Sequence, residues 1–286
     1  MLVTSSNDIE NWLRELVCLS NSNACQTPRF IKPFHLATLT HALRRNPVMA
    51  LSLPDKIGDY ADTMMLWDAL ELESPFGPKN RKPGRYYPLR LLNDEHAIED
   101  VAEELAKLFS EVCFDERTVD AVQLMLRELI GNCYAHSDVE DGLFGVICAQ
   151  VWGSGRKAQI TLADSGVGIR NSLRQNALLL DRLAHANSCE LATEYGVTSK
   201  PGKGHSGYGL AVARKLLEQN NGCLYVRSGY EAYALSANRS ESFTTPLRWD
   251  GTLLVIEWDL DTKMDIGLVY DSFPLPEGMN DDDFDF

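Results

Sequence analysis

The sequence lacks the segments that would place it in a membrane or export it. It has no apolar run near the roughly 20 residues that span a bilayer. Its first residues, 1–8, also lack the basic and then apolar pattern of a secretory signal. We therefore expect a soluble protein with no membrane partner.

Paired cysteines and excess positive charge are missing as well. The seven cysteines are odd in number, and no two stand at the CxxC spacing typical of zinc and redox sites. This argues against a disulfide framework or zinc site and favours the reducing cytoplasm. The net charge is -14, from 27 Lys and Arg against 41 Asp and Glu. Direct binding to nucleic acid is therefore not expected.

What remains is an ordinary globular composition, 44% hydrophobic over 286 residues, with one candidate boundary. In the stretch 74–85, three prolines and two glycines stand among basic residues, which continue neither a helix nor a central strand. Before it, apolar patterning predicts helices at 33–45 and 60–72 around a strand at 48–54. We predict an α/β module over 1–85, although a cap on one continuous domain fits equally well.

After the boundary, the patterning predicts a second domain over 86–265 and an acidic tail over 266–286. The expected strands are 86–92, 143–152, 158–163, 223–228 and 252–260, and the expected helices are 94–109, 115–135 and 208–219. This order predicts an α/β fold, an α+β sandwich with a mixed sheet and helices on one face.

Three short motifs within this domain carry the chemistry. Glu128, Asn132 and His136 recur every four residues, so they share one stripe of a helix. Alone, that stripe is more typical of the solvated side of an amphipathic helix. His136 is explained as well by capping the end of the helix.

The other two motifs are rich in glycine. Asp164-Ser-Gly166-Val-Gly168-Ile follows a predicted strand, where a plain turn would explain it alone. Gly204-His-Ser-Gly-Tyr-Gly-Leu precedes a predicted helix. Free amides at a helix start bind phosphate oxygens, although a flexible loop would explain the third motif alone.

In this order, the three motifs resemble the nucleotide-binding motifs of the GHKL ATPases. This superfamily contains the gyrase ATPase subunit, the large heat-shock chaperone, sensor histidine kinases and MutL. The resemblance implies the Bergerat-type ATP-binding fold with ATP and Mg²⁺ as ligands. It implies that Asn132 binds the metal, that Glu128 activates the attacking water, and that Asp164, supported by Thr252, accepts the adenine amino group.

The resemblance also implies that the segment 170–203 is a lid over the nucleotide, with Lys200 or Lys203 reaching the γ-phosphate. The residues expected at ATP on these grounds are Asn132, Asp164, Gly166, Gly168, Lys203, Gly204, His205, Ser206, Gly207, Tyr208, Gly209, Leu210 and Thr252.

Three classes of function remain open for such a site. The first, favoured by Glu128, is an ATP-hydrolysing switch in a bacterial regulatory or defence system, whose lid closure controls a partner protein. The second is a soluble serine or histidine kinase of the anti-sigma-factor type. The partners of such kinases are STAS proteins, which the N-terminal segment faintly resembles, but no histidine stands in the His-Glu-x-x-x-Pro context of a phosphoacceptor. The third is a non-hydrolysing nucleotide-binding scaffold.

The end of the sequence bears on partners. Too few residues follow position 260 for the second domain of the gyrase and mismatch-repair branches, so strand passage is not expected. The last residues, 281–286, set two phenylalanines among aspartates and resemble the acidic tip of bacterial single-stranded-DNA-binding proteins. Their composition favours a disordered, solvating end, and the sharper interpretation is a peptide that docks a partner protein. Homodimerisation through the N-terminal segment is left open.

Overall fold

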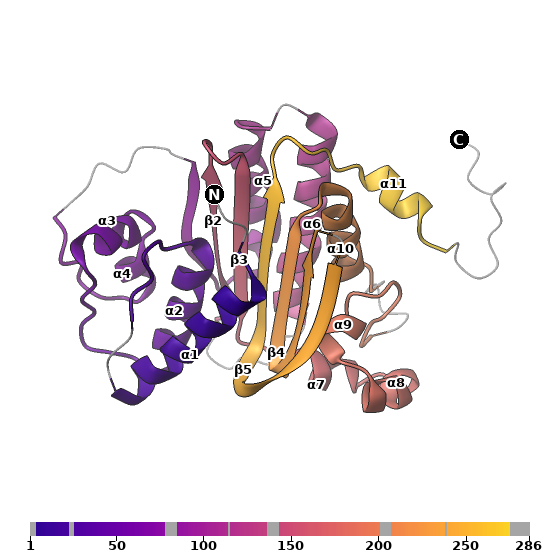
Figure 1. The fold of residues 1–286 in the computed structure, drawn as a ribbon, viewed down its shortest axis with the longest axis horizontal. Helices are drawn as coiled ribbons and strands as arrows, with labels where there is room; N and C mark the ends of the chain where they lie inside the picture. The colour runs from indigo at the N-terminus through magenta and orange to yellow at the C-terminus, as the bar shows by residue number, and fades with distance from the viewer. Residues whose placement is uncertain are drawn as a thin grey trace.

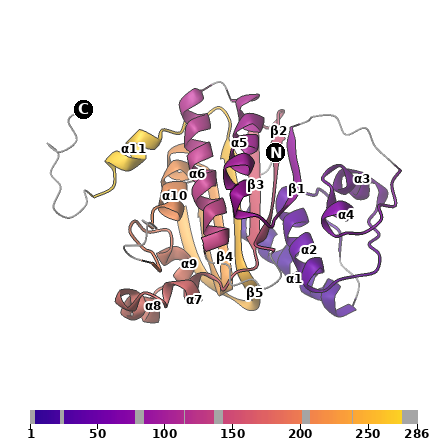
Figure 2. The same ribbon diagram turned by 180° about the vertical axis from the view of Figure 1, so that it is seen from behind.

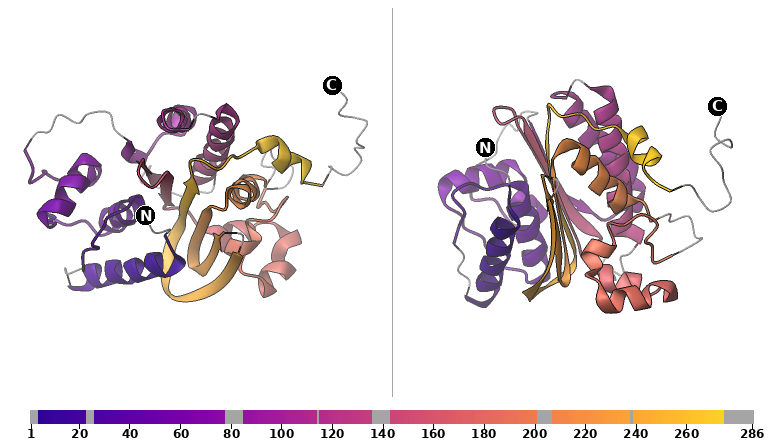
Figure 3. Two further views of the ribbon diagram at one scale, coloured as in Figure 1. Left: turned by 45° about the horizontal axis from the view of Figure 1, so that its top comes forward. Right: turned by 45° about the vertical axis from the view of Figure 1, so that its right-hand side comes forward.

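The protein is built as a sheet between two helical layers. The structure, a computed structural model, describes residues 4–22, 26–77, 85–113, 115–135, 143–200, 207–237 and 239–274. Figure 1 shows the strands obliquely, with the N-terminal helices on their left, and Figure 2 shows the same arrangement from behind. In the right panel of Figure 3, the N-terminal helices lie on one side of the sheet and the later helices on the other.

The sheet has five strands in the order β1-β2-β3-β5-β4, and every neighbouring pair is antiparallel. Its strands are β1 (Tyr86–Leu92), β2 (Gly145–Trp152), β3 (Lys157–Asp164), β4 (Cys223–Ser236) and β5 (Arg239–Asp259). The expected mixed sheet is therefore corrected. The two hairpins, β2–β3 and β4–β5, are antiparallel by construction, and the long connection from β3 returns β5 beside β3 in the opposite direction.

Three helices cover the first face of the sheet, as the sequence predicted. They are α5 (Ile98–Ser110), which follows the short η1 (Glu95–Ala97), α6 (Glu116–Ala135) and α10 (Gly209–Asn220). Their apolar faces share a core with Ile147, Leu162 and Ile256 of the strands. Asp94 starts this layer by accepting a hydrogen bond from the backbone of His96, and Asn221 ends α10 in the left-handed conformation with φ 53°.

The second face of the sheet is covered by the N-terminal segment, contrary to the expected helices on one face. Its helices are α1 (Ser6–Ser22), α2 (Pro33–Arg45), α3 (Asp55–Thr63) and α4 (Leu66–Ala69). They share a second core with Val146, Tyr225 and Val255 of the sheet. The strands are thus apolar on both faces, because both are buried.

This N-terminal segment is helical rather than α/β. The predicted strand at 48–54 is wrong: this stretch is extended chain that packs on the helices, and Trp67 Nε1 donates to the carbonyl of Leu51 over 3.2 Å. The predicted helix at 60–72 is divided at Met65, whose φ of 62° separates α3 from α4. Since the described part of 4–77 holds no strand, the STAS-like resemblance loses its basis.

Buried polar groups fix this N-terminal cap, residues 4–77, to the sheet. Glu257 of β5 is 3% exposed, and its carboxylate accepts hydrogen bonds from Thr4 Oγ1 over 2.7 Å and Gln159 Nε2 over 2.9 Å. Arg227 of β4, 1% exposed, pairs with Glu10 of α1 over 3.2 Å. A buried charge left without its partner is costly, so these pairs set one orientation of the cap.

Candidate functional site

A cleft of about 630 Å³ opens between α6, the end of β3 and the start of α10. The predicted residues that line it are Glu128, Asn132, Asp164, Gly168, Gly207, Tyr208, Gly209, Leu210 and Thr252. Gly166 joins them through a hydrogen bond to Asp164. The predicted residues His136, Lys203, Gly204, His205 and Ser206 lie outside the described residues. The structure thus brings parts of all three motifs to one place.

Asp164 ends β3 at the floor of this cleft. Its Oδ1 accepts two backbone hydrogen bonds, from Gly166 over 2.8 Å and from Thr252 over 2.9 Å. Burial raises the pKa of Asp164 to about 6, although these hydrogen bonds oppose the rise. At neutral pH the group is therefore a buried carboxylate, which is an acceptor and cannot donate.

Two glycines make room for this aspartate. Gly251 has φ +83°, and a Cβ on it would stand 2.0 Å from the carbonyl oxygen of Asp164. Gly168 has φ +81°, and its Cβ would stand 2.8 Å from Ser228 Oγ. Ser228, which the sequence analysis missed, links the two turns: it donates to the carbonyl of Gly251 over 2.8 Å and accepts from Ile169 N over 2.9 Å. A lone serine in a strand gave no signal of this role.

The opposite wall is the polar stripe of α6. Glu128 and Asn132 stand one helical turn apart there, and the start of α10 lies against both. A Cβ on Gly209 would be 3.1 Å from Cβ of Glu128 and 3.2 Å from Nδ2 of Asn132. The first amides of α10, which have no partner within the helix, therefore stand beside a carboxylate and an amide.

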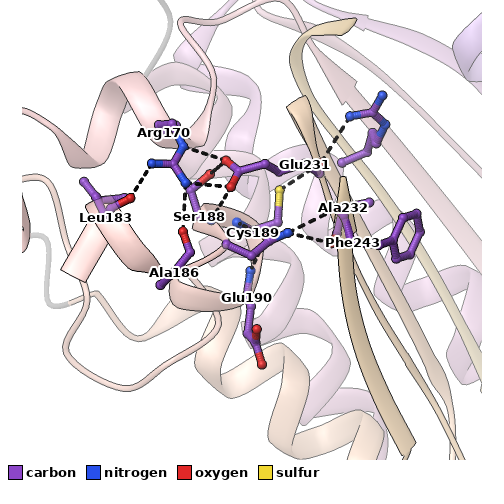
Figure 4. A network of polar contacts seen from close by, with 11 residues as sticks. Arg170, Leu183, Ala186, Ser188, Cys189, Glu190, Glu231, Ala232 and Phe243 are labelled. Carbon is purple, nitrogen blue, oxygen red and sulfur yellow. Dashed lines mark hydrogen bonds and ion pairs between the residues drawn. The ribbon is translucent and has the colours of Figure 1, made fainter. Parts of the chain in front are cut away.

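The first part of the predicted lid is held firmly to β4 (Figure 4). It forms α7 (Ile169–Leu173), η2 (Ala177–Leu179), α8 (Leu180–His185) and α9 (Ser188–Leu191). Arg170 makes a two-pronged ion pair with Glu231 at 2.7 and 2.6 Å, and it also donates to the carbonyls of Leu183 and Ala186. Ser188 Oγ donates to the same carboxylate over 2.5 Å.

This anchorage depends on a long β4–β5 hairpin that the sequence analysis missed. The predicted strand stopped at residue 228. In the structure, Gly229 takes φ +59° at a shift of register, and the ladder continues to the pair Ser236 and Arg239. The extension carries Glu231 to the lid.

The later part of the lid meets the start of α10 and the C-terminal segment through aromatic rings. Tyr195 stacks on Tyr208 with ring centroids 4.6 Å apart, and Phe273 lies 4.4 Å from Tyr195. Lys200, predicted as an alternative phosphate ligand, donates to the carbonyl of Ala135 over 2.7 Å. Ser199, 5% exposed, also lines the cleft, and its Oγ has no hydrogen-bond partner among the described residues.

The predicted acidic tail is corrected in its first part. Residues 266–271 form α11 (Ile266–Asp271), which Asp265 starts by accepting hydrogen bonds from Gly267 N and Leu268 N. Tyr270 on this helix has its pKa raised by burial and by the nearby charge of Glu128. The predicted docking peptide, 281–286, lies outside the described residues.

The donor set fits a nucleotide with magnesium. The amide oxygen of Asn132 is a hard ligand of the kind that Mg²⁺ prefers, and phosphates and water would supply the remainder of its shell. Among the described residues, no group of three His, Cys, Asp or Glu side chains forms a metal site by itself. The chain would therefore hold the metal together with phosphate.

Comparison with known families agrees with this geometry. Residues 118–255 match the family model described as histidine kinase-, DNA gyrase B-, and HSP90-like ATPase. This part of the chain belongs to the GHKL superfamily. The match supports ATP binding by a domain of this type, and the motif residues that line the cleft fall within the matched range.

Three further findings show how far this assignment extends. No curated protein matches the chain. None of the helices in the described ranges is long and apolar enough to cross a bilayer. The GHKL match begins within α6 and ends within β5, so it covers neither the N-terminal cap nor α11.

Proposed function

We propose that this protein is a cytoplasmic, magnesium-dependent ATPase whose lid closure controls a partner protein. The observation that carries the proposal is the cleft itself, in which Glu128, Asn132 and Asp164 from two motifs face the glycine-rich start of α10.

Asp164 is proposed to read the base. Its carboxylate is held at the floor of the cleft by the backbone of Gly166 and Thr252 and by the side chain of Thr252. A carboxylate accepts from the adenine amino group, whereas guanine presents a carbonyl there. Gly168 and Gly251 support this role by keeping side chains away from the floor of the cleft.

Glu128 and the start of α10 are proposed to serve the phosphates. The amides of Gly209 and Leu210 belong to the first turn of a 12-residue helix, whose dipole favours phosphate oxygens. Mg²⁺, held through Asn132, would neutralise phosphate charge. Glu128 would orient a water toward the γ-phosphate and take its proton.

The lid is proposed to move about its fixed root. Arg170, Glu231 and Ser188 hold the first half to β4, so closure is assigned to the segment that follows Leu191. Tyr195 and Tyr208 place that segment against both the phosphate end of the cleft and the C-terminal segment. A partner bound at the C-terminus would thereby sense the lid, which is the role proposed for 281–286.

The test is release of phosphate from γ-labelled ATP with Mg²⁺, with protein-bound label followed in the same samples. We expect the unaltered chain to release phosphate, Asp164→Asn to bind ATP more weakly, and Glu128→Gln to bind ATP without turnover. Glu99→Gln is the matched control, because Glu99 also lines the cleft but is paired with Arg127 over 2.6 Å. Label on the chain itself would instead favour a protein kinase, and turnover unchanged in Glu128→Gln would contradict the assigned base.

A further inference from the structure

The N-terminal cap reaches the nucleotide cleft through one histidine. His41 of α2 is buried, 5% exposed, and its Nε2 lies 3.0 Å from the carbonyl oxygen of Asp164. Its ring stacks on Trp249 of β5 with centroids 4.7 Å apart. Its neighbours therefore come from both strands that form the floor of the cleft.

The hydrogen bond has one possible direction. Burial lowers the pKa of His41 to about 4, helped by the charge of Arg45 and opposed by Asp250. The ring is therefore neutral at pH 7, with one N–H. A carbonyl oxygen can only accept, so the tautomer with its proton on Nε2 donates to Asp164, and Ser165 Oγ lies 3.4 Å from the same nitrogen.

His41 forms its hydrogen bond at the position where the backbone pairing of β3 with β5 ends. The last pair of β3 with β5 is Ala163 with Leu253. At the next position, the backbone of Thr252 donates to the side chain of Asp164 rather than continuing the ladder. The carbonyl oxygen of Asp164 accepts a hydrogen bond from His41 of the cap.

Asp164 is thus held from two sides. Gly166 and Thr252 fix its carboxylate, and His41 fixes its backbone carbonyl. We propose that His41 is a positioning residue for nucleotide recognition, which makes the N-terminal cap part of the adenine site. The inference rests on the proposed function, in which the Asp164 carboxylate meets the adenine amino group.

If His41 positions Asp164, its replacement should reduce the affinity for nucleotides that carry the 6-amino group more than for those that lack it. If His41 only stabilised the fold, its replacement would weaken every nucleotide equally. If it aims the Asp164 carboxylate, its replacement weakens ATP more than purine riboside 5′-triphosphate, which lacks the 6-amino group. The ratio of the two affinities isolates the contact between Asp164 and that amino group.

The variants separate the donor from the ring. His41→Phe keeps an aromatic ring against Trp249 but has no N–H, and His41→Met, also without a donor, serves if His41→Phe does not fold. His41→Gln returns an N–H at nearly the same reach. Thr38→Val is the control on the same helix: it removes a hydrogen bond to Trp12 Nε1, 2.8 Å long, without touching Asp164.

The experiment measures the dissociation constants of both triphosphates for the full chain by calorimetry. We expect His41→Phe to reduce the preference for ATP about five-fold, the worth of one ordinary hydrogen bond. His41→Gln should restore the preference. Thr38→Val should lower the melting temperature while leaving the preference unchanged.

Asp164→Asn distinguishes the two ways of failing. If it leaves the preference for ATP unchanged, the assignment of Asp164 to the base is wrong, and the role of His41 falls with it. If Asp164→Asn abolishes the preference but neither His41→Phe nor His41→Met alters it, the proposed function stands and the inference about His41 is overturned.

Discussion

Gly209 at the start of α10 packs directly on Glu128 of α6. A Cβ atom added to Gly209 would lie only 3.1 Å from the Cβ of Glu128. Contacts of 3.0–3.4 Å are tighter than most real Cβ contacts, so any side chain would push the helices apart by a few tenths of an ångström. The distance between the Glu128 carboxylate and the first backbone amides of α10 is therefore this short because Gly209 has no side chain.

Gly209→Ala should impair turnover more than folding. Alanine restricts the unfolded chain more than glycine does, by about 0.4–1 kcal/mol, which offsets part of the cost of the tight contact. The displacement of α10 from Glu128 should lower phosphate release about ten-fold. Steady-state kinetics and thermal melting measure the two effects, and Gly77→Ala, whose Cβ would meet nothing within 4 Å, is the control. Unchanged kinetics in Gly209→Ala would refute the importance of this contact.

Gly251→Ala should disrupt the floor of the cleft through a clash. Glycine 229 also has a positive φ, but a Cβ there would meet nothing within 4 Å, so Gly229→Ala measures the backbone strain alone, about 1–2 kcal/mol. Gly251→Ala adds the collision with the carbonyl of Asp164, and we expect at least roughly twice that loss in unfolding free energy. Urea titration of both variants tests the difference, and equal losses would contradict the clash.

Asp164→Asn should stabilise the protein at neutral pH. A pKa raised from 3.8 to about 6 corresponds to a penalty of up to about 3 kcal/mol for the charged form. Because the folded pKa is the higher one, this penalty is present above pH 6, shrinks as the pH falls from 6 toward 3.8, and vanishes below that range. Unfolding free energies of both proteins at pH 7.5 and at lower pH give the comparison. A variant no more stable than the unaltered chain at pH 7.5 would argue against a penalty at Asp164.

Glu231→Gln should loosen the root of the lid. Burial raises the pKa of Glu231, but the hydrogen bonds from Arg170 and Ser188 outweigh it and hold the pKa below its ordinary value. The interaction is therefore present at neutral pH and is lost as the pH falls below about 4.5. We expect a loss of about 2 kcal/mol, faster amide exchange across α7 to α9, and a smaller difference at low pH.

The control for this variant is a comparable pair in the same segment. Arg182 and Glu194 also form an ion pair, but both side chains are nearly half exposed. Glu194→Gln should cost less than about 1 kcal/mol, because solvent screens such pairs. Equal effects of the two substitutions would mean that the Arg170 network adds nothing beyond a surface pair.

The sequence predicted the GHKL domain well because its signals are local. The stripe of Glu128 and Asn132, the strand that ends at Asp164 and the glycines before α10 each depend on a few neighbouring residues. The helices α5, α6 and α10 and the strands β1 to β3 accordingly appear close to their predicted bounds, whereas β4 and β5 are much longer than predicted. Once these elements adopt the expected fold, the polar stripe of α6 packs against Gly209.

The errors arose where tertiary contacts override the local pattern. The stretch 48–54 has the composition of a strand, but it lies on the cap, where the described residues offer no neighbouring strand to pair with it. Gly229 reads as the end of a strand, but it forms a bulge. His41 reads as one polar residue on an apolar helix, and only the position of β3 in space reveals its contact with Asp164.

The second helical layer, the N-terminal cap, makes the folding unit of this protein larger than the part that matches the family model. A fragment cut to residues 118–255 would retain the recognisable motifs but lose β1, α5 and the N-terminal cap. Tyr225, Leu253 and Val146, which the cap now covers, would then face water across one whole side of the sheet. Such an exposed apolar surface promotes aggregation. The part of the chain that matches the GHKL family is therefore smaller than the part that buries both faces of the sheet.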